Sequence, residues 1–197
     1  MIRPPVVIFN TPLSGSSAIA HIFHCHGLWL GDTSVKRGYD TGENADINRR
    51  LLPLICKDGR RDFVMANGGS RDTVRELLED IVPADTDWAW KGSIDYWPIF
   101  FDLIPDSKYV FVQRPIEMVA MSKERRGEDT YEDALAAADR HYMKMLYHSD
   151  AWRIPFVYAD EVIGGNHESI RAAFEHCGLA FDPALAAEAI APALFHR

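Results

Sequence analysis

The chain has 197 residues, 47% hydrophobic and 25% charged, with a formal net charge of −8 at pH 7. This composition is ordinary for a globular protein with a sizeable core, and we expect one domain over residues 1–197. The acidic balance argues against general binding of nucleic acid or anionic membranes, although a small anionic ligand needs only local cations. Three widely spaced cysteines, Cys25, Cys56 and Cys177, indicate neither a disulfide framework nor a Cys-x-x-Cys metal site.

The N-terminal residues lead directly into an apolar segment, without the basic region and apolar stretch of a secretory signal. No apolar run reaches the ~18 residues expected of a membrane-spanning helix. These features argue against export and against a membrane segment. Together with the cysteine usage, they predict a cytoplasmic protein.

Apolar runs that alternate with amphipathic stretches predict a series of strands and helices along the chain. The expected strands are 5–10, 63–66, 87–91, 108–113 and 154–158, and the expected helices are 16–26, 44–56, 70–81, 95–103, 115–124, 131–148 and 167–177. Residues 31–43 contain three glycines and show no periodicity, so we expect a loop there. The alternation predicts an α/β fold of three layers, with a mainly parallel central sheet flanked by helices.

A turn of small residues, Pro12-Leu13-Ser14-Gly15-Ser16-Ser17, connects the first strand to a helix. Gly15 permits close backbone approach, and the N–H groups and partial positive charge of a helix N-terminus favour an anion. Phosphate is the expected ligand. The nucleotide-triphosphate loop G-x-x-x-x-G-K-[ST] is not matched, because Asn10 stands at its first Gly and Ser16 at its Lys. A turn with serine caps and no ligand is the alternative.

A second candidate anion site follows the expected strand 108–113. Arg114 ends that strand, Pro115 can begin a helix, and Ser122 lies further along it. Ligands of open α/β sheets bind at the carboxyl ends of the strands, so Arg114 and Ser122 are placed to bind a second phosphate. For Arg114, a surface ion pair is the alternative.

Together the two segments resemble the sulfotransferase family. That family binds the 5′-phosphosulfate of 3′-phosphoadenylyl sulfate with a P-[KR]-S-G-T-[ST] loop, and residues 12–17 are similar to this loop. The family binds the 3′-phosphate with an R-x7-S pattern, to which Arg114 and Ser122 are similar. Less specific similarities follow in family order at Trp90-Lys91, at residues 105–108, at residues 157–162 and at residues 177–179. The resemblance implies a P-loop-like fold. It also implies that the donor, or its product 3′-phosphoadenosine 5′-phosphate, is bound by Ser14, Gly15, Ser16, Ser17, Arg114 and Ser122.

Leu13 is the main departure from the family pattern. The family has Lys or Arg there, which neutralises charge on the departing oxygen, and losing such a contact commonly costs ~100-fold or more in rate. Lys91 is the expected substitute, because a strand ending near it would bring its ammonium to the same sheet edge as Gly15 and Arg114. A solvated lysine at a strand end is the alternative. The His of the family's K-T-H segment is absent, since Ser93 stands at its position.

The helix after the turn contains His21, His24 and His26 around Cys25. His21 and His24 share a face, whereas His26 and Cys25 point elsewhere, so the spacing argues against a metal site and no metal is expected. We expect His21 to act as the general base, because several sulfotransferases resemble this layout with a Glu at that position. A histidine packed within an apolar helix is the alternative.

The resemblance therefore implies transfer of a sulfuryl group from 3′-phosphoadenylyl sulfate to a hydroxyl or amine of an acceptor that the sequence does not identify. The expected partners are this nucleotide and a small acceptor, with no nucleic acid and no membrane. Two alternatives stay open. One is a non-catalytic nucleotide-binding or interaction protein with the same fold, which Leu13 favours. The other is a small-molecule kinase with a degenerate P-loop, which needs acidic Mg²⁺ ligands such as Asp95, Asp160 or Glu161.

Overall fold

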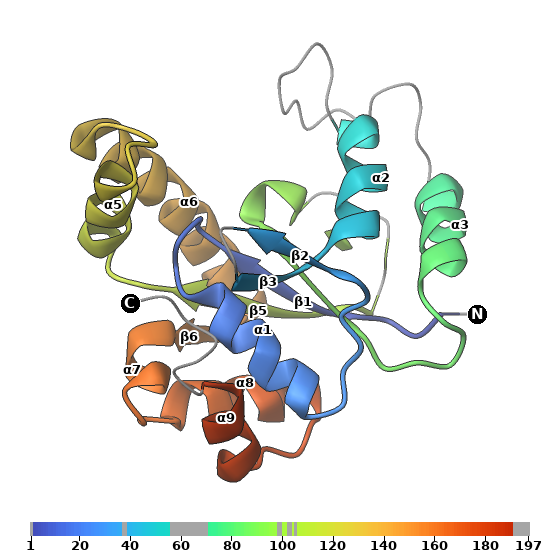
Figure 1. Cartoon of the computed structure of the whole chain (residues 1–197). Helices are drawn as coiled ribbons and strands as arrows, with labels where there is room; N and C mark the ends of the chain where they lie inside the picture. Colours follow the sequence, from blue (N-terminus) through green and yellow to red (C-terminus); the bar gives the residue numbers. More distant parts are fainter. Residues whose placement is uncertain are drawn as a thin grey trace.

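A parallel sheet lies at the centre of the fold (Figure 1). The computed structural model describes residues 2–36, 39–55, 71–97, 100, 101, 104 and 106–190, and within them the sheet has four strands. In spatial order these are β4 (Ala89–Ser93), β1 (Val6–Asn10), β5 (Lys108–Gln113) and β6 (Phe156–Tyr158). Asn10 pairs in register with Ser93 on one side and Val112 on the other, so the carboxyl ends of three strands meet at one edge.

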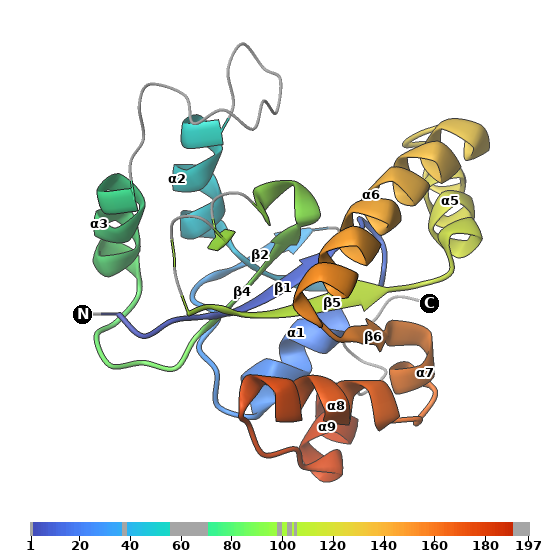
Figure 2. The ribbon, with the colours of Figure 1, turned by 180° about the vertical axis from the view of Figure 1, so that it is seen from behind.

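Helices cover both faces of the sheet, which confirms the predicted layered α/β fold. The face carrying Val6 and Ile8 packs against α1 (Ser16–Cys25), α7 (Ala159–Ile163), α8 (Glu168–Cys177) and α9 (Pro183–Ala189). The face carrying Val7 and Phe9 packs against α2 (Ala45–Ile55), α3 (Arg71–Ile81) and α6 (Tyr131–Trp152), as Figure 2 shows from behind. Because both faces are buried, β1 is a continuous apolar run up to Asn10 rather than an alternating one.

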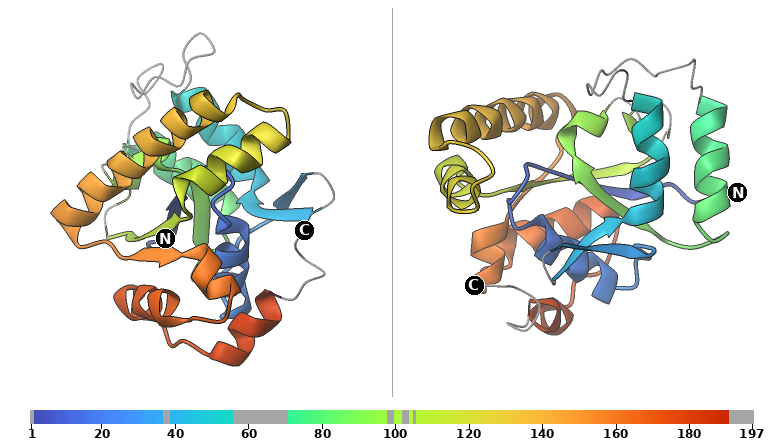
Figure 3. Two further views of the ribbon diagram at one scale, coloured as in Figure 1. Left: turned by 90° about the vertical axis from the view of Figure 1, so that its left-hand side faces the viewer. Right: turned by 45° about the horizontal axis from the view of Figure 1, so that its top comes forward.

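The helix α5 (Ile116–Arg125) packs against α6, and the two form a pair beside the sheet (Figure 3). Thr130 caps the N-terminus of α6 by accepting a hydrogen bond from the Asp133 N–H, which explains why this long helix begins at Tyr131. Within the described ranges, no helix combines the length and the apolar character needed to cross a lipid bilayer.

Residues 31–43 are not a loop, and that prediction is wrong. They contribute to an antiparallel hairpin of β2 (Thr33–Lys36) and β3 (Tyr39–Asn44). The Thr41 hydroxyl donates to the Ser34 carbonyl at 2.8 Å, which ties the two strands together. Gly42 is required by packing, because a Cβ added there would lie 2.9 Å from the Ala20 Cβ of α1. The glycine therefore lets the hairpin lie directly on α1.

Several element boundaries also differ from the predictions. The strand predicted at 87–91 is β4, shifted toward the C-terminus, and the one predicted at 63–66 lies outside the described residues. Where a helix was predicted at 95–103, residues Ile94–Tyr96 form a 3-10 turn, η2, and the described residues 97, 100 and 101 are helical. The short helices α7 and α9 were not predicted, although the Asp182 cap followed by Pro183 is a recognisable start signal for α9.

Candidate active site

The turn between β1 and α1 has the features of an anion-binding loop. Leu13 and Gly15 both adopt positive φ, 63° and 79°. The side-chain oxygens of Thr11 and Ser14 are buried and have no hydrogen-bond partner among the described residues. In addition, α1 has neither a side-chain cap nor an acidic residue in its first turn. Buried hydroxyls and helix N–H groups rarely stay unpaired, so this turn can donate several hydrogen bonds to a ligand.

Asn10 explains how the turn is held without the first glycine of a nucleotide-triphosphate loop. Its amide Nδ2 donates to the hydroxyl of Ser16, so the end of β1 is tied to the start of α1. Both side chains are buried. Ser16 thus stabilises the turn through its side chain, and its backbone N–H at the first position of the helix has no intrahelical partner.

Gly15 is the tightest point of this turn. A Cβ added there would lie 2.8 Å from the Ala159 Cβ at the start of α7. The segment predicted to resemble the family's motif at residues 157–162 therefore packs against the back of the turn.

We expect Gly15→Ala to lower the free energy of unfolding by more than the ~1–2 kcal/mol that a left-handed backbone alone costs an L-residue. The excess comes from the contact with Ala159, and urea denaturation would measure it. Gly127→Ala is the matched control, because Gly127 also has positive φ, 66°, but a Cβ there meets nothing within 4 Å. Equal losses in the two variants would show that Ala159 does not constrain the turn.

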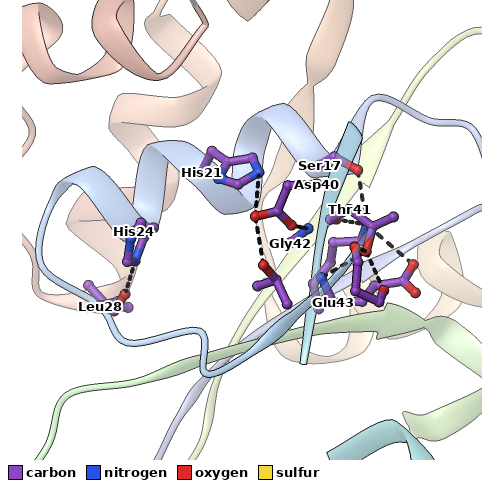
Figure 4. A network of polar contacts seen from close by, with 11 residues as sticks. Ser17, His21, His24, Leu28, Asp40, Thr41, Gly42 and Glu43 are labelled. Atoms are coloured by element: carbon purple, nitrogen blue, oxygen red, sulfur yellow. Dashed lines mark hydrogen bonds and ion pairs between the residues drawn. The ribbon is translucent and has the colours of Figure 1, made fainter. Parts of the chain in front are cut away.

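Lys91 reaches the first turn of α1. Its side chain is only 3% exposed, so it is not the solvated lysine of the alternative interpretation. The ammonium Nζ donates to the Ser17 hydroxyl at 3.2 Å and to the Thr41 carbonyl at 2.6 Å, and it lies 3.4 Å from the Glu43 carboxylate. Figure 4 shows Ser17 facing Thr41 and Glu43 across this contact. The structure thus brings Lys91 together with the start of α1, just after the small-residue turn, and with β3.

His21 lies further along α1 and faces β3. Its Nε2 is 3.9 Å from a carboxylate oxygen of Asp40 (Figure 4). Asp40 in turn accepts hydrogen bonds from the Thr33 hydroxyl at 2.6 Å and from the Gly42 N–H at 2.8 Å. The Asp40 carboxylate is therefore fixed by hydrogen bonds within the hairpin, and it faces the imidazole of His21.

The other two histidines, His24 near the end of α1 and His26 just after it, make hydrogen bonds that stabilise the fold. His24 Nδ1 contacts the Leu28 carbonyl at 3.0 Å, and His26 Nδ1 contacts the Ile22 carbonyl at 2.7 Å. His26 Nε2 accepts a hydrogen bond from the Asp182 N–H at 2.9 Å, which joins the end of α1 to the start of α9. No group of three or more potential metal-ligating side chains occurs in the part of the chain that the structure describes.

Arg114 lies at the end of β5 and is held by α7. Its Nε donates to the Asp160 carboxylate at 3.0 Å, and its side chain is 27% exposed. Among the described residues, the Nε bond to Asp160 is the hydrogen bond that the guanidinium makes. Ser122 donates to the Met118 carbonyl of its own helix at 2.8 Å, so the structure does not bring Ser122 and Arg114 into direct contact. Before Arg114, the buried Gln113 also leaves its Oε1 unpaired within the described residues.

The acidic residues considered for Mg²⁺ have protein partners in separate places. Asp95 contacts Lys144 at 2.6 Å and His141 at 3.3 Å. Burial alone raises the pKa of the Asp95 carboxyl, but the hydrogen bonds from His141 and Lys144 outweigh it and hold the pKa well below its usual range. Asp160 pairs with Arg114, and Glu161 accepts a hydrogen bond from Asn166 at 3.3 Å. Each of the three carboxylates therefore already has a partner within the protein.

Three polar groups near the turn were missed by the sequence analysis. They are Thr11, which extends the predicted anion site, and Asp40 and Glu43, which lie in the hairpin that was predicted as a loop. The alternation of β-branched and aromatic residues around the Asp40-Thr41-Gly42 segment is the signal for those strands. No local signal pairs Glu43 with Lys91, because the two residues are far apart in the chain.

Comparisons with known proteins find a likeness in structure but not in sequence. No protein-family model and no curated protein matches the sequence. The sulfotransferase STF1 from Mycobacterium tuberculosis is similar with a TM-score of 0.60 and 14% identity, over 98% of this chain and 72% of that one. The sulfotransferase domain of the curacin biosynthetic pathway matches with a TM-score of 0.56 and 12% identity, over 94% and 77% of the two chains. The sulfotransferase domain of the Synechococcus PCC 7002 olefin synthase matches with a TM-score of 0.54 and 18% identity, over 93% and 76%. The chain therefore has a sulfotransferase-like fold, with the central parallel sheet and flanking helices of these domains.

Proposed function

We propose that the protein is a sulfotransferase that uses 3′-phosphoadenylyl sulfate as the donor and a hydroxyl or amine compound as the acceptor. One observation carries the proposal. The turn after β1 combines buried unpaired hydroxyls with an uncapped helix N-terminus, and the buried ammonium of Lys91 lies against the same helix turn. These are the groups that an anionic phosphosulfate requires, and the fold is one that known sulfotransferase domains share.

In this proposal the two anion sites bind opposite ends of the nucleotide. The segment Ser14, Gly15, Ser16 and Ser17 holds the 5′-phosphosulfate, with Thr11 as an additional hydroxyl. Arg114 and Ser122 hold the 3′-phosphate. The Asp160 carboxylate occupies Nε of Arg114 and leaves the two terminal nitrogens for the ligand, which is the bidentate geometry that arginine offers to a phosphate.

The donor supplies a sulfuryl group on a phosphate leaving group, and two side chains of this protein would assist its transfer. As the bond from sulfur to the phosphate oxygen breaks, negative charge develops on that oxygen, and the Lys91 ammonium stabilises it. His21 accepts the proton of the acceptor hydroxyl or amine as the new bond to sulfur forms. Asp40 stabilises the imidazolium that results. The scheme uses no metal ion.

Leu13 favours a second candidate function, a nucleotide-binding protein without transfer activity. Its side chain cannot supply the cationic contact of the family's loop, so Lys91 would have to supply that contact. One series of assays distinguishes the sulfotransferase from the binding protein. If the protein binds 3′-phosphoadenosine 5′-phosphate tightly but transfers sulfate to no member of a broad panel of alcohols, phenols and amines, the binding function is the correct one.

We expect 3′-phosphoadenosine 5′-phosphate to stabilise the native state, because it offers a phosphate to each of the two sites. Binding to the native state alone adds ~2.7 kcal/mol of stability at a hundredfold excess over the dissociation constant. A thermal shift and calorimetric titration would measure the effect. ATP, with and without Mg²⁺, is the matched comparison, because binding only of ATP with Mg²⁺ would indicate a kinase. No shift and no heat at millimolar 3′-phosphoadenosine 5′-phosphate would refute the assignment of the site.

A further inference from the structure

Glu43 provides a negative charge beside the most buried lysine of the site. Its carboxylate lies 3.4 Å from Lys91 Nζ, and the Glu43 side chain is 23% exposed whereas that of Lys91 is 3% exposed. A buried ammonium is unstable relative to the neutral amine unless an opposite charge or several hydrogen bonds compensate for the lost water. Here the Thr41 carbonyl and the Glu43 carboxylate, both on β3, compensate for it.

The hairpin fixes Glu43 relative to α1. The Glu43 N–H donates to the Thr41 hydroxyl at 3.3 Å, and the same hydroxyl is tied to Ser34 on β2. Gly42, which lies between Thr41 and Glu43 in the chain, packs on Ala20 of α1 so closely that there is no room for a Cβ. The backbone at Glu43 is therefore held by packing and hydrogen bonds, so its side chain starts from a fixed position beside Lys91.

The contact between Lys91 and Glu43 lies among β4, β1, α1 and β3. The strand β1 lies beside β4 and pairs the apolar residue Ile8 with Lys91. Helix α1 presents the Ser17 hydroxyl and, a turn further on, His21, which faces Asp40 of β3 (Figure 4). From β3, Glu43 faces Lys91 directly.

We infer that Glu43 is a positioning residue that keeps Lys91 protonated and held against the first turn of α1, where the donor phosphosulfate binds. The inference rests on the proposed function for the identity of the anion, but the effect of Glu43 on Lys91 is independent of it. Glu43 then has two opposite effects on an anionic ligand. It repels the anion directly, and it maintains the charge that attracts the anion.

The repulsion of the anion and the maintenance of the Lys91 charge can be distinguished by changing the pH. At the lower pH values, where Lys91 is protonated in both proteins, Glu43→Gln removes only the repulsion and should bind 3′-phosphoadenosine 5′-phosphate more tightly than the wild type. At higher pH the Lys91 ammonium of the variant, which lacks the neighbouring carboxylate, loses its proton first. Between pH 7 and pH 9.5 the variant should then lose at least about 2-fold more affinity than the wild type, since a charge-assisted contact is lost. The ratio of the variant's dissociation constant to that of the wild type therefore rises with pH.

The first measurement needs no ligand. Lysine labelled with ¹³C at Cε reports its own protonation by NMR, and Lys91→Met assigns the Lys91 signal. We expect the Lys91 signal of Glu43→Gln to titrate at least about one pH unit below that of the wild type, because the variant has lost the neighbouring negative charge. Asp40→Asn is the matched control, because it removes a carboxylate of the same strand that faces His21. An unchanged Lys91 titration in Glu43→Gln would overturn the inference.

The second measurement is calorimetry with 3′-phosphoadenosine 5′-phosphate between pH 7 and pH 9.5, with the ratio of dissociation constants compared among variants. Glu43→Asp, which keeps the charge, should retain the alkaline binding that Glu43→Gln loses, and it guards against a folding defect in the amide variant. A ratio that is constant with pH would contradict the role of Glu43, whether the variant binds more weakly or more tightly throughout. If the NMR titration shifts as expected but the wild type binds no ligand, Glu43 still holds the charge of Lys91 and the donor assignment alone is wrong.

Discussion

Replacing Lys91 with alanine should lower the turnover number for sulfuryl transfer by about 100-fold or more, with the fold retained. The reason is electrostatic: Lys91 brings a buried cation to the first turn of α1, and a single such contact with the departing oxygen commonly contributes this much to the rate. Turnover with a labelled donor would measure the loss, and circular dichroism would verify the fold. Lys108→Ala is the matched control, because Lys108 is an exposed lysine at the opposite, amino end of β5.

Leu13→Lys extends this test. In the Lys91→Ala background it returns a cation to the position where the family carries one, and we expect part of the lost turnover to return. Leucine and lysine are both unbranched at Cβ, so the left-handed backbone at position 13, with φ of 63°, should accept the change without new strain. Undiminished turnover in Lys91→Ala would exclude the proposed role of Lys91, whatever Leu13→Lys does.

Arg114→Ala should weaken 3′-phosphoadenosine 5′-phosphate at least ~10-fold while changing the affinity for adenosine 5′-phosphate little. Only the first ligand has a 3′-phosphate, and a charge-assisted hydrogen bond to it is typically worth ~1.5–3 kcal/mol. Calorimetry with both ligands would measure the selectivity. Arg126→Ala, which removes an arginine just beyond the end of α5, is the control for a general loss of positive charge. Equal weakening of both ligands in a folded Arg114→Ala protein would place Arg114 elsewhere in the site.

The sequence was sufficient for those parts of the site that are local in the chain. A strand, a small-residue turn and a helix start are contiguous at residues 6–17, and so are the strand end and helix start around Arg114. Each can be recognised because neighbouring residues determine backbone geometry and the position of the N–H groups. The layered fold followed from the same local alternation.

The parts that failed depend on contacts between distant segments. Gly42 looks like a loop residue because its need for a missing side chain arises from Ala20 on another element. The pairing of Lys91 with Glu43 and that of Arg114 with Asp160 join residues that are 48 and 46 positions apart by their numbers in the sequence. Charge and hydropathy patterns in a single sequence do not reveal which acidic residue such a cation meets. Only the packing of the hairpin and of α7 on the sheet decides it.

The start of α7 also couples the two proposed anion sites. Ala159 backs the turn at Gly15, and the next residue, Asp160, holds the guanidinium of Arg114. One peptide unit thus joins the two contacts, so a substitution that displaces the start of α7 would disturb both proposed sites together.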